Sequence, residues 1–235
     1  MYERENTLLL SSTASALCNN LSVNRTSAKS KGGVATKLAV VHQNNINIIP
    51  VAESDKTRPQ YITCHNNSAL CEVMQVLWCD LGFEVVLVVA STLGLDIYDR
   101  DGVDLLFSHP CMDGPEDEYS FVKGIATLNN EVLCAGNSSG VLRVFGVLDE
   151  ETCLSFMDRK EGHMDAITDI ASSRNYSSSA VRPGWTAVIC LWEINLLCSS
   201  QINDQMLVGG RFLNTNGTGF CVSAYDTNLV HCFKT

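Results

Sequence analysis

Four short stretches decide the fold: LDIYD at Leu95–Asp99, LRVFG at Leu142–Gly146, ICLWE at Ile189–Glu193 and VHCFK at Val230–Lys234. Each reaches an aromatic residue at its fourth position, and consecutive aromatics are separated by 47, 47 and 41 residues. The aromatics are Tyr98, Phe145, Trp192 and Phe233. Alternation of apolar and other residues over four or five positions indicates a strand buried on at least one face. A period of about 40–50 residues built from strands is typical of a β-propeller, with one sheet per repeat.

The repeats extend outward from these stretches over a single expected domain, residues 1–235. We expect an all-β propeller with repeats at 14–51, 73–109, 121–157, 163–198 and 204–235, which gives about five blades. The polar segments 24–33 and 52–69 are expected to be loops. The last repeat has room for only three strands, so we expect the isolated strand at residues 2–10 to complete it. Such closure hides two otherwise open sheet edges.

The fourth repeat carries the clearest motif. Gly162-His163 precedes an apolar strand, and Trp192-Glu193 closes the repeat 29 residues after the histidine. A Gly-His near the start and a Trp-Asp near the end are the signature of a WD repeat, and here the final pair is Trp-Glu. Asp169 lies on the strand between them. We expect all four motif residues, Gly162, His163, Asp169 and Trp192, to serve structure by local hydrogen bonding and packing.

Charge and cysteine content restrict the classes of partner and compartment. The net charge of −10 would repel phosphate backbones, which argues against broad binding to nucleic acid or anionic membranes. No run approaches the roughly 20 apolar residues that span a bilayer. The eleven cysteines are odd in number, and most lie within apolar strands, as free core cysteines do. We therefore expect a reduced, cytoplasmic protein, with the acidic segment 111–119 as a solvated loop or a contact for a basic partner.

Two groups of residues are candidate sites of chemistry. Cys64-His65, Cys71 and Cys79 form the densest cysteine cluster, but their spacing does not match the paired cysteines of structural zinc sites. A propeller hydrolase would use inner-strand carboxylates, with Asp80, Asp169 and Asp204 as candidates. The favoured interpretation has no catalytic, cofactor or metal site, and describes a scaffold that binds other proteins. The hydrolase remains the alternative.

Several longer stretches carry a family resemblance. ALCNNLSV at 16–23, GHMDAITDIA at 162–171 and GGRFLNTNGTGFCVSAYD at 209–226 resemble the WD repeat-containing protein 54 family. The resemblance implies a cytosolic WD40-type β-propeller of about seven blades, without catalytic residues or a cofactor. It also implies that this chain lacks about two blades between Asn175 and Trp192. On this basis the expected fold is an incomplete propeller of about five blades.

Overall fold

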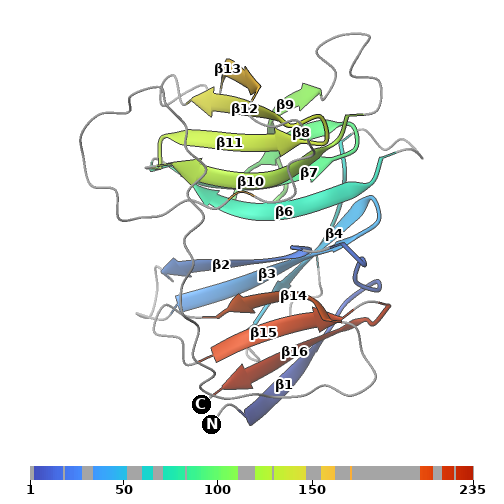
Figure 1. The fold of residues 1–235 in the computed structure, drawn as a ribbon. Helices are drawn as coiled ribbons and strands as arrows, with labels where there is room; N and C mark the ends of the chain where they lie inside the picture. Colours follow the sequence, from blue (N-terminus) through green and yellow to red (C-terminus); the bar gives the residue numbers. More distant parts are fainter. Residues whose placement is uncertain are drawn as a thin grey trace, which may run out of the picture.

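The computed structural model describes residues 3–17, 19–27, 34–51, 60–65, 71–82, 84–110, 120–128, 130–146, 155–161, 170, 207–213, 219–224 and 226–234. Every regular element in these segments is a β-strand, and all strand pairs are antiparallel. The strands form four sheets of four strands each (Figure 1). The chain thus has the all-β architecture of a WD40-type propeller.

Three of the sheets are built from consecutive strands. The first contains β2 (Leu21–Ser27), β3 (Val34–His42), β4 (Asn45–Pro50) and β5 (Gln60–Thr63). The second contains β6 (Val73–Asp80), β7 (Val85–Ser91), β8 (Gly94–Tyr98) and β9 (Leu105–Pro110). The third contains β10 (Val122–Leu128), β11 (Val132–Asn137), β12 (Val141–Gly146) and β13 (Ser155–Glu161).

The fourth sheet joins the two ends of the described chain. It contains β14 (Leu207–Phe212), β15 (Gly219–Ala224), β16 (Leu229–Lys234) and, beside β16, β1 (Glu3–Leu9). The register places Thr7 opposite His231 and Leu8 opposite Val230. Figure 1 draws the N- and C-termini side by side at this pair. The expected closure of the last sheet by the first strand is confirmed.

The hydrophobic core lies between neighbouring sheets. One cluster joins the fourth sheet to the first, a second joins the first to the second, and a third joins the second to the third. The first strands β2, β6 and β10 contact one another in that order, and β14 contacts β2. Middle strands are therefore covered on both faces, which explains the continuous apolar run VVLVVAS of β7. This face-to-face stacking is the packing of propeller blades.

The aromatic of each repeat occupies the same place in three sheets. Tyr98, Phe145 and Phe233 lie near the end of the third strand and are 5%, 0% and 6% exposed. At each of them the pairing with the outer strand shifts by one residue, as a β-bulge does. The first sheet lacks the aromatic, and its β4–β5 pairing runs without a shift. The similar surroundings confirm that the three stretches are copies of one unit.

Some expected boundaries were wrong. Asn24–Ser27 belongs to β2 rather than to a loop, and β5 lies inside the segment 52–69 that was expected to be a loop. The last strand of the third sheet runs over Ser155–Glu161, beyond the expected limit of residue 157. The fourth repeat, 163–198, falls outside the described residues except for Ile170.

Candidate functional site

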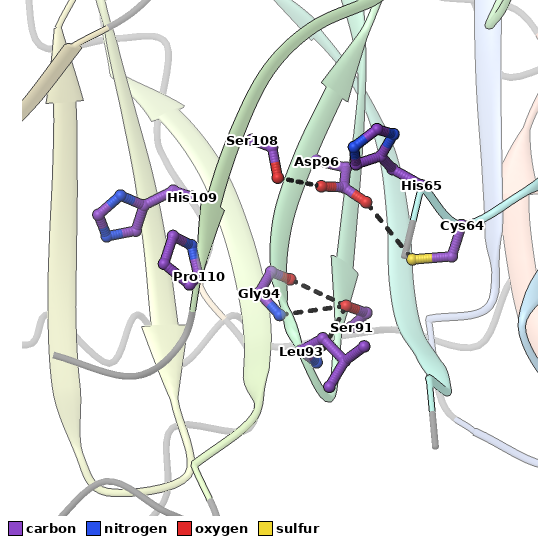
Figure 2. A pocket seen from close by; sticks show the side chains of 9 residues that line it. All are labelled: Cys64, His65, Ser91, Leu93, Gly94, Asp96, Ser108, His109 and Pro110. Atoms are coloured by element: carbon purple, nitrogen blue, oxygen red, sulfur yellow. Dashed lines mark hydrogen bonds between the residues drawn. The ribbon is translucent and has the colours of Figure 1, made fainter. Parts of the chain in front are cut away.

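A cavity of about 230 Å³ opens where the chain passes from the first sheet to the second (Figure 2). Cys64 and His65, just after β5, form one side of it. The β7–β8 turn and the start of β8 form the second side, and the end of β9 forms the third. The lining residues from these two parts are Ser91, Leu93, Gly94, Asp96, Ser108, His109 and Pro110. Three chain segments thus converge on one small polar cavity.

Asp96 is the buried polar group of this cavity. The residue is 7% exposed, and it lies on β8, the third strand of its sheet, between the core residues Leu95 and Ile97. The Ser108 hydroxyl donates to Asp96 Oδ1 at 2.7 Å, and the Cys64 thiol is 3.4 Å from Oδ2 (Figure 2). Both contacts involve neutral donors. Asp96 therefore connects β8 to Ser108 of β9 and to Cys64, which follows β5.

Ser91 and Gly94 shape the turn that forms the floor of the cavity. Ser91 Oγ accepts hydrogen bonds from the backbone amides of Leu93 and Gly94, each at 3.2 Å. The same hydroxyl lies 3.2 Å from the carbonyl oxygen of Gly94. Gly94 has a φ of +153° and is paired with Pro110 of β9. The Ser91 side chain thus closes the turn. Because Gly94 has no Cβ atom, the start of β8 can lie close to the end of β9.

The position of Asp96 recurs in the other sheets as a buried polar residue. Asn47 of β4 accepts from the Ser11 amide at 3.1 Å and donates to Ser12 Oγ at 2.8 Å, so it binds the segment that leads into the first sheet. Arg143 and His231, each two residues before the aromatic of its strand, are 1% and 2% exposed. The shared signal is an ionisable residue at the second position of three of the four repeated stretches, LDIYD, LRVFG and VHCFK. Sequence reasoning used the fourth position and missed the second.

The cysteine cluster is divided by the structure. Cys64 and Cys71 are hydrogen-bonded neighbours in the core between the first and second sheets, whereas Cys79 faces the third sheet. Burial is the main cause that raises the pKa of the Cys64 thiol, followed by the hydrogen bond with Cys71. A neutral buried thiol is a poor nucleophile. Within the described segments, no group of three or more histidine, cysteine, aspartate or glutamate side chains could hold a metal ion.

Most of the other residues singled out in the sequence lie outside the described part of the chain. This applies to Gly162, His163, Asp169, Trp192 and Asp204, and to the acidic segment 111–119. Asp80 is described: it is exposed at the end of β6, and its Oδ1 accepts from the Gly82 amide at 3.0 Å. This contact assigns Asp80 to the β6–β7 turn. Over the described residues, no helix is long and apolar enough to cross a membrane.

The buried thiols predict loss of stability at alkaline pH. Burial raises the pKa of Cys134 from 9.0 to about 11, and burial also raises the pKa of Cys79. The unfolded chain then releases these protons first, so stability is full below pH 9 and falls as the pH rises toward 11. Each thiol adds a slope of up to about 1.4 kcal/mol per pH unit. Urea unfolding at pH 8, 9 and 10 measures the fall in the free energy of unfolding, and Cys134→Ala should make this fall shallower. The same fall in wild type and Cys134→Ala would show that the Cys134 thiol does not cause it.

The sequence of the chain is similar to that of known proteins. The family described as WDR54 matches residues 1–198. The mouse protein named "WD repeat-containing protein 54" is 30% identical over 202 residues, which cover 82% of this chain and 59% of the relative. The rat "WD repeat domain 54" and the human "WD repeat-containing protein 54" are 29% and 28% identical with the same coverage. The chain thus spans about 59% of the length of these relatives.

Proposed function

Because the chain belongs to the WDR54 family, we propose that it is a non-enzymatic scaffold that binds other proteins through the loops of its propeller. WD-repeat proteins stack rigid sheets and offer the connections between strands as contact surfaces. Family membership supports the general role of an interaction module. The structural observation that carries the proposal is that buried polar side chains form hydrogen bonds to the segments that connect the strands and sheets.

These side chains fix loops in place. Asn47 binds the segment before the first sheet, and Asp96 binds the segment before the second. Asn137 closes the β11–β12 turn by accepting from the amides of Ser139 and Val141 at 3.1 and 2.8 Å. Its amide nitrogen also donates to Ser120 Oγ at 2.8 Å, before β10. Ordered connections at one end of the sheets suit recognition of a partner surface, because little entropy is lost when they bind.

The net charge supports a protein partner with basic regions, and the buried thiols support a cytoplasmic location. The net charge of −10 favours basic regions of partner proteins over nucleic acid. All six cysteines in the described segments are buried, and Cys64, Cys71, Cys79 and Cys134 are free thiols. Free core thiols fit a reducing compartment, so we place the protein in the cytoplasm.

The proposal extends to the length of the chain. The chain spans about 59% of the relatives' length, and we infer from the sequence of the fourth repeat that about two blades are missing between Asn175 and Trp192. Sequencing of the transcript across the codons for residues 175–192 tests this point. A continuous reading frame that matches the present sequence would support a genuine short product, and an intervening stretch of two repeats would overturn it.

The scaffold role predicts a stoichiometric protein partner that binds one end of the sheets. We expect the purified full chain to capture such a partner and to retain it through gel filtration. Two charge-reversal variants form a matched pair: Glu72→Lys, just before β6, and Asp104→Lys, in the β8–β9 turn. Both residues are exposed. One variant should weaken the complex about tenfold or more while both keep the wild-type melting temperature. No stable partner, or equal binding by both variants, would contradict the proposal.

A further inference from the structure

We propose that the cavity around Asp96 is a binding site for the arginine side chain of a partner protein. The inference rests on the scaffold role and gives it a recognition chemistry. Within the described part of the chain, Asp96 has no lysine or arginine as a counter-ion. A carboxylate on a buried residue is costly to keep charged when its hydrogen-bond donors are neutral, and a cation offsets that cost.

The described lining of the cavity includes two histidines, His65 and His109, but no lysine or arginine. Among the described residues, no lysine or arginine forms an ion pair with Asp96; the pair Lys37–Asp101, at 2.6 Å, involves the β8–β9 turn at the other end of β8. The sequences that follow the cavity walls, NNSAL at 66–70 and CMDGPEDEY at 111–119, contain no lysine or arginine either. Asp96 therefore keeps acceptor capacity for a charged donor from outside.

The size and shape of the cavity select one side chain. Its volume of about 230 Å³ is below the roughly 300–1,000 Å³ of pockets for drug-sized ligands, so it suits a single long side chain. Leu93 and Pro110 offer apolar walls for an aliphatic stem, and the carboxylate lies between them and the linker (Figure 2).

The two carboxylate oxygens favour guanidinium over ammonium. Ser108 and Cys64 contact one oxygen each, which leaves a lone pair on both. A guanidinium group can donate to the two oxygens at once, whereas an ammonium group acts as a point charge.

The first test uses short peptides and the full chain. We expect acetyl-Gly-Gly-Arg-Gly-Gly-amide to bind saturably in an NMR titration, with the largest shifts at Cys64, His65 and Ser108. The lysine peptide should bind more weakly, and the citrulline peptide, which keeps the shape but not the charge, about tenfold more weakly or worse. No binding of the arginine peptide, or equal binding of all three, would overturn the proposal.

Two variants assign the binding to Asp96. Asp96→Asn keeps an oxygen for Ser108 and should lose arginine-peptide affinity about tenfold or more, while Asp104→Asn makes the same charge change at the β8–β9 turn and should bind as wild type. If Asp96→Asn does not fold, Ser108→Lys decides, because its ammonium group should occupy the cavity and block the peptide. Unchanged binding by a folded Asp96→Asn, or by Ser108→Lys, would overturn the proposal.

The same variants separate this site from the scaffold role. A captured protein partner that binds Asp96→Asn as tightly as wild type would overturn the arginine site and leave the scaffold intact. Arginine-peptide binding that depends on Asp96, in a chain that captures no protein partner, would support the site and refute the scaffold.

Discussion

Replacement of Gly94 with alanine should lower the melting temperature by roughly 5–20 °C. A Cβ atom on Gly94 would lie 2.2 Å from the carbonyl oxygen of His109 and 2.9 Å from Cα of Pro110. Both atoms belong to the backbone of β9, so β9 would have to move away from β8. The φ of +153° adds strain of about 1–3 kcal/mol, and overpacking adds about 1–3 kcal/mol. The sum corresponds to the stated range for a chain of this size.

Gly82→Ala is the matched control for Gly94→Ala. Gly82 also has a positive φ, +84°, but its Cβ atom would lie 3.2 Å from the Asn130 carbonyl oxygen, which a small adjustment relieves. We therefore expect a loss of about 1–3 kcal/mol from strain alone. Chemical unfolding of both variants measures the difference. A Gly94→Ala protein as stable as Gly82→Ala would show that β9 is not held against β8 in this register.

The strands that could be predicted are those whose pattern is local. Leu95–Tyr98 and Leu142–Phe145 alternate, end at an aromatic and follow a glycine turn, and all three features depend on residues near in sequence. The closing strand was also predictable, because a three-stranded last repeat leaves an edge that a spare strand can cover. In these cases the packing between sheets reinforced the local preference.

Sequence patterns did not predict β5 or the second half of β2, because both contain polar residues that their places in the sheet allow. In β5, Ile62 is buried while Tyr61 is 48% exposed, since an outer strand faces water along its edge. In β2, Asn24 is buried within the first strand of its sheet. Sequence reasoning treated polar residues as loop residues, and only the sheet neighbours reveal that their backbone is paired.

The candidate site could not be predicted because its parts are distant in sequence. Cys64, Asp96 and Ser108 meet only through the register of β8 with β9 and the placement of Cys64, just after β5, against β8. The second positions of LDIYD, LRVFG and VHCFK gave a usable signal, since Asp96, Arg143 and His231 are ionisable residues with an apolar neighbour on each side. A buried polar residue in a strand implies a partner from elsewhere in the chain.

Deletion of residues 1–9 should have an effect at least as large as Gly94→Ala. The deletion removes β1 and exposes the edge of β16 from Leu229 to Lys234, while the opposite edge stays paired with β15. It also removes Leu8 from the cluster between the fourth and first sheets, next to Cys232 and Val230. We expect a melting temperature lower by about 10 °C or more and association between chains, because an open apolar edge accepts foreign strands.

A peptide added in trans tests whether the loss comes from the edge itself. A synthetic peptide of residues 1–10 should restore the melting temperature in proportion to its concentration, as binding to the folded state requires. The same peptide with Leu8→Lys should fail, because it keeps the backbone donors but places a charge in the cluster that contains Cys232. A truncated chain that stays monomeric with the wild-type melting temperature would show that β1 does not hold the fourth sheet closed. Rescue by both peptides would show that pairing of the backbone alone, without Leu8, completes the sheet.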